Sequence, residues 1–264
     1  MSTTTRTPLG VTYDDLGEGG PPLLLLTGWC SSRDRWASVA ALAARHRRVV
    51  NVDWRGHGGS AAAEEDFGLD ELVEDALAVV DACGLESFIP CTASHAGWAA
   101  IELRRRLGER IPAIVHLDWM VAAPSAPYME LLARLQTAEA WRESRATLFD
   151  VWRGGVELPA IEEAIDVMEA QGAEMWMRSG RVIAGSYHEH GTPLAAHAAL
   201  EHASSVLHLY GQPRTPEYLE WQQVAADEHP WFEVHQLDGV DSHFSMLEAP
   251  AAVAAAIERA AAAL

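Results

Sequence analysis

The feature that most constrains the fold is a regular alternation of short apolar runs with amphipathic helical stretches. Apolar runs occupy residues 23–27, 49–53, 88–92 and 113–117. Glycine, proline or charged residues bound these runs, which is typical of buried strands. Apolar residues at helical spacing fill the intervening residues 36–45, 69–82 and 97–107. Strands that alternate with helices are typical of the α/β class, so we predict a doubly wound, parallel sheet.

The alternation stops in the middle of the chain, where apolar residues recur every three to four positions, as they do in helices. We therefore predict a helical cap, residues 122–191, inserted into a core made of residues 1–121 and 192–264. The strand pattern resumes near Ser205, and an alanine-rich stretch of strong helix formers ends the chain.

Composition excludes several classes of function. The 264 residues include 38 acidic and 19 basic side chains, a formal net charge of −19, and a chain this acidic repels phosphate backbones and anionic membrane surfaces. We therefore expect neither a nucleic acid nor a membrane as a partner. Every Lys/Arg position is arginine, which excludes Schiff-base chemistry on a lysine, including lysine-anchored pyridoxal phosphate.

The cysteines and the N-terminus indicate the compartment. Cys30, Cys83 and Cys91 are scattered without a CxxC pair, which argues against a disulfide framework and a thiolate zinc site and fits a reducing compartment. The first residues lack the apolar region of a signal peptide, so we expect a cytoplasmic protein. Ten tryptophans suit either a pocket for a flat ligand or the core.

A predicted strand-to-helix junction reads T-A-S-H-A-G-W and places Ser94 at its turn. Small residues around such a serine are typical of a nucleophile elbow, in which a sharp turn directs one side chain into the pocket. A serine between a strand and a helix is also an ordinary N-cap, so this motif alone leaves both interpretations open. The backbone N–H of Trp29, after the first long strand, is placed to join that of His95 in holding an oxygen anion.

The loop G-V-D-S-H-F-S-M-L-E-A-P, ahead of the final helix, carries a candidate base, His243. Histidine has a proton affinity near neutral pH and needs an acid that fixes its tautomer and stabilises the imidazolium. Asp118 ends a predicted strand whose carboxyl end opens on the same crevice. We predict an Asp118–His243 dyad, with Asp238 and Asp241, which flank the histidine, as alternative acids.

Together with D-W-R-G-H-G-G-S at residues 53–60, these pieces resemble the α/β-hydrolase fold family over essentially the whole chain. The resemblance implies a mostly parallel sheet of the eight-stranded type, flanked by helices, with an inserted helical cap. One feature departs from the family pattern. The acid that commonly follows the strand after the cap, in a G-x-x-D sequence, is missing, because that stretch reads G-Q-P-R at residues 211–214. This departure favours Asp118 as the acid.

Four short sequences resemble a subset of this fold, the cofactor-free ring-cleaving dioxygenases: G-W-C at 28–30, S-H-A-G-W at 94–98, L-D-W at 117–119 and S-H-F at 242–244. The resemblance implies that O2 is inserted at C2 and C4 of a 3-hydroxy-4(1H)-quinolone, that carbon monoxide leaves and that N-formylanthranilate remains. It implies no metal and no cofactor, with the N-heteroaromatic substrate and O2 as partners. A ring unsubstituted at C2 and a 2-methyl ring both remain open.

The residue chemistry is consistent with that reaction. Triplet O2 reacts slowly with closed-shell organic molecules, so an enzyme without metal or flavin must make its substrate electron-rich, and deprotonating an enol does this. His243 would remove the 3-hydroxyl proton, while the N–H groups of Trp29 and His95 hold the charge on the 4-oxygen. Ser94 would then hydrogen-bond the substrate without attacking it, and Trp29 and Trp152 would wall the ring.

Three other functions remain open from the residues. Ser94, His243 and Asp118 also fit the triad of a serine hydrolase acting on an ester, a lactone or a C–C bond. His116 with Asp118 and His243 spells the H-x-D…H of a non-haem iron dioxygenase, although a histidine inside a buried strand is more commonly a core residue. The sequence H-E-H at 188–190 is a similar, weaker signal. The third alternative is a non-catalytic ligand-binding protein on the same scaffold.

Overall fold

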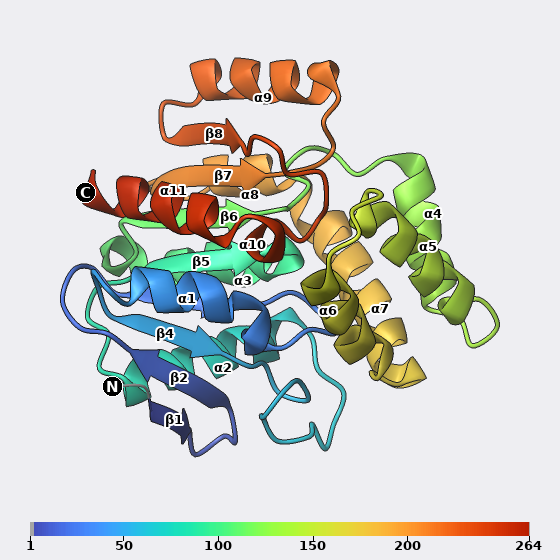
Figure 1. Cartoon of the computed structure of the whole chain (residues 1–264), viewed down its shortest axis with the longest axis horizontal. Helices are drawn as coiled ribbons and strands as arrows, with labels where there is room; N and C mark the ends of the chain where they lie inside the picture. Colours follow the sequence, from blue (N-terminus) through green and yellow to red (C-terminus); the bar gives the residue numbers. More distant parts are fainter. Residues whose placement is uncertain (1–2, 264) are drawn as a thin grey trace.

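Eight strands form one sheet in the order β1-β2-β4-β3-β5-β6-β7-β8 (Figure 1), in a computed structural model that describes residues 3–263. The strands are β1 (Thr3–Arg6), β2 (Thr12–Leu16), β3 (Leu23–Leu26), β4 (Val49–Val52), β5 (Ile89–Ala93), β6 (Ala113–Leu117), β7 (Ser205–Tyr210) and β8 (Phe232–Gln236). The pairs β1·β2 and β2·β4 are antiparallel, and the other neighbouring pairs are parallel. The predicted α/β class with a mostly parallel sheet is confirmed.

The sequence does not predict β1. All four of its residues are exposed, and the strand lies at the edge of the sheet with Thr3 opposite Asp15 of β2. A strand exposed along its whole length carries no apolar alternation, and it is held by backbone pairing with β2 and by side-chain hydrogen bonds, such as that from the Thr4 hydroxyl to Asp14 at 2.6 Å.

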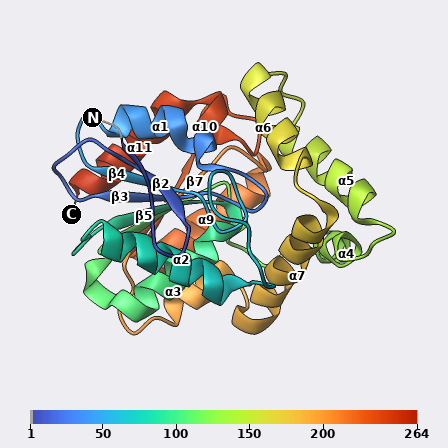
Figure 2. The ribbon, with the colours of Figure 1, turned by 90° about the horizontal axis from the view of Figure 1, so that it is seen from below.

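Helices cover both faces of the sheet. α1 (Ala37–Ala43) and α11 (Pro250–Ala262) lie on one face, and α2 (Leu69–Ala82) and α3 (Gly97–Leu107) lie on the other (Figure 2). α8 (Pro193–Ala198) packs against α3. α9 (Pro216–Glu228) packs beside β8. The remaining short elements are η1 (Arg33–Trp36), η2 (Ser94–Ala96), η3 (Gly108–Arg110) and α10 (Ser245–Glu248).

The four leucines of β3 explain why a continuous apolar run is a strand here. Successive side chains of a strand point to opposite faces. Leu24 and Leu26 pack into the cluster under α2 and α3, whereas Leu23 and Leu25 pack under α1 and α11, and all four are fully buried. A central parallel strand covered by helices on both sides needs this composition.

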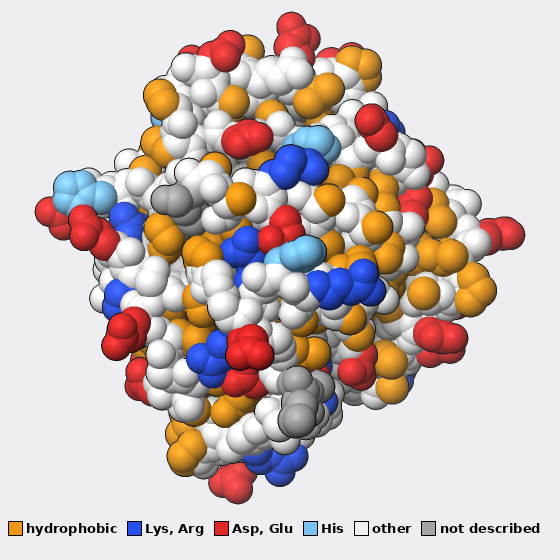
Figure 3. Space-filling view, turned by 60° about the vertical axis from the view of Figure 1, so that its left-hand side comes forward, with side chains coloured by type: hydrophobic (Ala, Val, Ile, Leu, Met, Phe, Trp, Pro, Cys, Tyr) orange, Lys and Arg blue, Asp and Glu red, His pale blue; other side chains and the backbone are white. Residues whose placement is uncertain are grey.

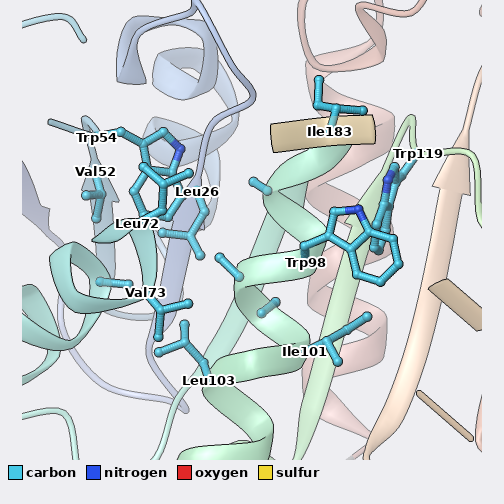
Figure 4. Close-up of a cluster of buried hydrophobic side chains, with 14 of the residues drawn as sticks. Leu26, Val52, Trp54, Leu72, Val73, Trp98, Ile101, Leu103, Trp119 and Ile183 are labelled. Atoms are coloured by element: carbon cyan, nitrogen blue, oxygen red, sulfur yellow. The ribbon is translucent and has the colours of Figure 1, made fainter. Parts of the chain in front are cut away.

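Four helices occupy most of the chain between β6 and β7, and they lie beyond the carboxyl ends of the parallel strands (Figure 1). They are α4 (Ala126–Leu135), α5 (Trp141–Arg153), α6 (Pro159–Glu169) and α7 (Ala173–His190). Their buried side chains continue the core under α3. Figure 4 shows Ile183 of α7 above Trp98 of α3, which lies beside Trp119. The helices therefore cover the end of the sheet at which active sites of α/β folds are found.

Charged side chains are dispersed over the face shown in Figure 3. Acidic and basic side chains alternate there with uncharged ones and do not gather in one patch. Within residues 3–263, no helix is long and apolar enough to cross a membrane.

Candidate active site

Three turns with left-handed backbone mark the site. Cys30 follows β3 with φ 61°, Ser94 follows β5 with φ 54° and Asp118 follows β6 with φ 51°. The three strands are neighbours in the sheet. A positive φ in a residue other than glycine costs roughly 1–3 kcal/mol, and such residues cluster at functional sites. The strain is therefore concentrated where the parallel strands end.

The turn after β5 has the geometry predicted for an elbow. Ser94 opens η2, and α3 follows at once. A Cβ at Gly28 would lie 3.5 Å from the Cβ of Ser94, so the end of β3 closely approaches this turn. The backbone N–H groups of Trp29 and His95 both lack an acceptor within residues 3–263. The two predicted donors are thus available to an oxygen atom beside Ser94.

His57 holds the turn that carries Trp29. Its Nε2 accepts the backbone N–H of Cys30 at 3.0 Å, and its Nδ1 lies 2.9 Å from the carbonyl oxygen of Arg55. Burial lowers the pKa of His57 to about 4, so the ring is neutral and Nδ1 carries the proton. The indole of Trp29 also stacks on Phe67, with ring centroids 5.5 Å apart. This positioning role was not predicted, although His57 lies in the D-W-R-G-H-G-G-S motif.

The motifs S-H-A-G-W and L-D-W meet in space. A Cβ at Gly97 would overlap the ring of Trp119, so only glycine fits there. Trp119 also packs edge-to-face on Trp98, with centroids 5.1 Å apart. Its indole N–H donates to Nδ1 of His95 at 3.2 Å. Residues of both motifs therefore pack against one another around the Trp119 ring, next to the turn that carries Ser94.

The side chain of His95 forms a chain of hydrogen bonds that ends at Tyr128 of α4. Because Nδ1 of His95 accepts from Trp119, its proton lies on Nε2, which donates to the Tyr128 hydroxyl oxygen at 2.8 Å. Burial lowers the pKa of His95 to about 3, so this ring stays neutral. Tyr128 was not predicted as a site residue, because an aromatic residue in a predicted cap helix has no distinguishing sequence signal.

Asp118 is 3% exposed and accepts three hydrogen bonds. The backbone N–H of Gly211 and the Ser245 hydroxyl donate to Oδ1 at 3.0 and 2.7 Å, and the backbone N–H of Ser245 donates to Oδ2 at 3.0 Å. Burial raises the pKa of Asp118 to about 6, against the opposing effects of these donors and of Arg35. A Cβ at Gly211 would lie 2.6 Å from Val240. The G-Q-P-R stretch after β7, which has no carboxylate of its own, thus supplies the Gly211 N–H as a donor to Asp118 at the end of the neighbouring strand β6.

His243 faces the site as a neutral base. Burial and, after it, the positive charge of Arg35 hold its pKa well below the ordinary value. Its ring stacks on Trp152 of α5, with centroids 5.3 Å apart and planes 18° apart, and its backbone N–H donates to the Trp152 carbonyl oxygen at 2.8 Å. Trp152, predicted only from its position, is therefore in direct contact with the predicted base.

The predicted acid and base line one recess, but no hydrogen bond joins the His243 ring to the Asp118 carboxylate within residues 3–263. The alternative acids lie elsewhere. Asp241 is at the surface and pairs with Arg214 at 3.4 Å, and Asp238 is exposed. Of the three carboxylates considered, Asp118 is the one that lines the recess.

Two adjoining cavities lie at the site. The inner one, of about 30 Å³, is lined in part by α4 to α7, and the outer one, of about 220 Å³, opens beside Trp119. Both are lined by Ser94, His95, Tyr128, Trp152 and His243. The apolar side chains of α4 to α7 in the inner cavity are Leu132, Leu135, Leu148, Met168, Trp176 and Ile183. His243 and Ser94 are therefore shared by the walls of both cavities.

The side chains of the iron alternative do not form a ligand set. His116 is fully buried within β6, with Nδ1 2.7 Å from the Thr92 hydroxyl and Nε2 2.8 Å from Nε2 of His197. Both ring nitrogens are therefore engaged in the core. In the part of the chain that the structure describes, no group of three His, Cys, Asp or Glu side chains is placed to hold a metal ion.

Comparison with known proteins identifies the family. The family described as alpha/beta hydrolase fold matches residues 21–153. The chain is 38% identical over 238 residues to 2-heptyl-3-hydroxy-4-quinolone dioxygenase AqdC1 of Rhodococcus erythropolis, covering 90% of this chain and 85% of that protein. It is 32% identical over 250 residues to 1H-3-hydroxy-4-oxoquinoline 2,4-dioxygenase of Pseudomonas putida, covering 94% of each.

Solved structures agree with the sequence relatives. An AqdC variant in complex with its substrate, from work on recognition and ring cleavage of the Pseudomonas quinolone signal, superposes with a TM-score of 0.94 at 32% identity and covers 100% of both chains. The match covers the sheet and the helices α4 to α7 alike. The chain therefore belongs to the ring-cleaving quinolone dioxygenases of the α/β-hydrolase fold family.

Proposed function

We propose that this chain is a cofactor-independent dioxygenase that cleaves the N-heteroaromatic ring of a 3-hydroxy-4(1H)-quinolone with O2 and releases carbon monoxide. The unsubstituted substrate would give N-formylanthranilate, and a 2-alkyl substrate would give the corresponding N-acylanthranilate. The observation that carries the proposal is a neutral His243 that lines the same cavity as Trp29 and His95, whose backbone N–H groups have no acceptor within residues 3–263.

The base step follows from this arrangement. Neutral His243 accepts the proton of the 3-hydroxyl group, and the substrate becomes an electron-rich enolate that can donate an electron to O2. The N–H groups of Trp29 and His95 hold the negative charge that spreads onto the 4-oxygen. The electrons for the reaction come from the substrate anion.

Asp118 stabilises the imidazolium that results. A carboxylate offers about four acceptor positions, and Asp118 uses three of them. One position on Oδ2 is therefore left for the His243 ring. We propose that this ring shifts toward Asp118 within its stack on Trp152 as the proton is transferred.

Ser94 binds the substrate in this mechanism and does not attack it. Ser94 and His243 line the same two cavities, which places the serine hydroxyl within reach of a ligand bound beside the base. The relatives named as quinolone dioxygenases support the dioxygenase over the serine hydrolase. The ring would lie between Ser94 and the indoles of Trp29 and Trp152.

The substrate class we propose includes quinolones with an alkyl chain at C2. The relative in Rhodococcus erythropolis is named for a 2-heptyl substrate. The inner cavity, of about 30 Å³, is lined by apolar side chains such as Leu132, Leu148 and Ile183, which would have to move apart to admit such a chain. In this proposal residues 122–191 act as the cap, since they supply these side chains and Trp152, and residues 1–121 and 192–264 form the core. The cytoplasmic location remains a prediction.

The test is anaerobic mixing of chelator-treated protein with 3-hydroxy-4(1H)-quinolone, followed by admission of O2. We expect the spectrum of the deprotonated substrate before O2 is added and carbon monoxide in the headspace afterwards. Turnover of p-nitrophenyl esters that is lost in Ser94→Ala, without carbon monoxide, would instead identify a serine hydrolase.

A further inference from the structure

A buried arginine lines the inner cavity without an acidic partner. Arg35 of η1 is 6% exposed, and within residues 3–263 no carboxylate oxygen lies within 4.0 Å of its guanidinium. Its Nη2 donates to the carbonyl oxygen of His243 at 3.1 Å, and the guanidinium lies 4.4 Å above the Phe244 ring. Its Nε is buried without a partner. A buried cation is costly unless an opposite charge compensates it.

The groups that face Arg35 define the charge of the cavity. Asp118 is the acid whose charge raises the pKa of Arg35, against the effect of burial. Burial keeps His243 and His95 neutral. With Asp118 ionised, the two cavities together carry one positive charge, on Arg35 of the inner cavity, and one negative charge, on Asp118 of the outer cavity. Transfer of the substrate proton to His243 adds one more of each sign, so the sum stays at zero. Without Arg35 the two cavities would carry one excess negative charge when the anion is formed.

We propose that Arg35 is the fixed positive charge that allows this cavity to bind a 3-hydroxy-4-quinolone as its 3-oxido anion. This inference rests on the function proposed above and assigns that function a further residue. A charge inside a poorly solvated cavity acts over several ångströms, so Arg35 favours the anion without touching it. The flat, delocalised enolate is the chemical class of ligand that this cavity selects.

The competing explanation is that Arg35 only anchors the loop of His243 through the hydrogen bond to its carbonyl oxygen. A purely structural anchor acts only through this hydrogen bond, so Arg35→Gln, which keeps a donor but not the charge, should then leave the ionisation of the bound substrate near that of the wild type. The two roles therefore differ in a spectroscopic quantity, the apparent pKa of the bound 3-hydroxyl group.

The experiment is an anaerobic spectrophotometric pH titration of protein-bound 3-hydroxy-4(1H)-quinolone in the wild type, Arg35→Met, Arg35→Gln and Arg35→Lys. We expect Arg35→Met and Arg35→Gln to raise the apparent pKa of the bound substrate by about one unit or more, which is about a tenfold loss in preference for the anion. Arg35→Lys keeps the charge and should restore most of that preference.

The matched control is Arg47→Met. Arg47 is also 6% exposed, but it pairs with Glu258 near the amino ends of β3 and β4, away from the cavity. Its loss removes a buried arginine and should leave the pKa of the bound substrate unchanged. The control thus separates a local charge from a general effect of losing a buried cation.

Two results would overturn the proposal. One is an unchanged substrate pKa in Arg35→Met and Arg35→Gln. The other is failure of all three Arg35 variants to fold while Arg47→Met folds, because Arg35 would then be a structural residue. Failure of the proposed function is seen separately, since the wild type would then bind no anion and release no carbon monoxide.

Discussion

Asp118 and Ser245 are joined by two hydrogen bonds, one from the Ser245 backbone N–H to Oδ2 at 3.0 Å and one from its hydroxyl to Oδ1 at 2.7 Å. The two residues lie 127 positions apart in the chain, and both are buried. Burial favours the neutral acid, whereas these donors favour the carboxylate. The pKa of Asp118, about 6, is therefore a balance that a single hydroxyl group can move.

The first prediction concerns the Ser245 hydroxyl. Ser245→Ala removes a donor to the ionised form, so the pKa of Asp118 rises further. Activity requires the ionised form, so the acid limb of the kcat/KM profile, expected near pH 6 in the wild type, moves upward by about one unit. The measurement is kcat/KM for O2-dependent quinolone loss from about pH 4 to pH 9, which covers the limb on both sides in the wild type and in Ser245→Ala.

Ser144→Ala is the control for this shift. Ser144 is buried in α5, and its hydroxyl has no partner within residues 3–263. Its removal should leave the acid limb in place. A limb that stays fixed in Ser245→Ala, or that moves to lower pH, would show that Asp118 does not control it.

The second prediction contrasts the base with the elbow serine. His243→Ala removes the group that accepts the substrate proton and should lower kcat/KM by on the order of 10²–10⁴-fold. Ser94→Ala removes one hydrogen bond to a charged ligand and should lower kcat/KM by about 10- to 100-fold. Carbon monoxide release under saturating O2 provides the readout. The reverse order, with Ser94→Ala the more damaging, would indicate a nucleophilic serine.

The third prediction concerns the ring that stacks on the base. Trp152→Leu removes the stacked partner of His243, and an aromatic pair contributes about 0.5–1.5 kcal/mol beyond its buried area. We expect kcat to fall by roughly 2- to 10-fold, with most of it recovered in Trp152→Phe. Trp221→Leu, on an exposed part of α9, is the control and should leave kcat unchanged. Equal rates for Trp152→Leu and wild type would contradict a role for the stack.

The fourth prediction is one of stability. Gly97→Ala places a Cβ against the ring of Trp119 and should destabilise the fold by about 1–3 kcal/mol, measured by urea unfolding. Gly185→Ala is the control, because nothing lies within 4 Å of its Cβ position in α7. Alanine should stabilise that helix by about 0.5–1 kcal/mol. Equal effects of the two substitutions would mean that the Gly97–Trp119 contact is not tight.

The sequence by itself determined the class and order of most elements. The apolar run of β3 and the helical spacing of α2 and α3 reflect local backbone preference and side-chain periodicity, which are properties of short segments. Ser94, Asp118 and His243 could be placed near one another because the carboxyl ends of neighbouring parallel strands share an edge. β1 was not predicted, because all its residues are exposed and show no alternation of apolar and polar side chains.

Only the tertiary structure decided which groups touch. Ser245 donates to Asp118 from 127 positions away, and Arg35 donates to the carbonyl oxygen of His243 from 208 positions away. Trp152 stacks on His243 because the helices between β6 and β7 fold over the strand ends. Such contacts leave no local pattern in the sequence. They depend on close packing between segments brought together by burial, and that packing also sets the charge state of each buried group.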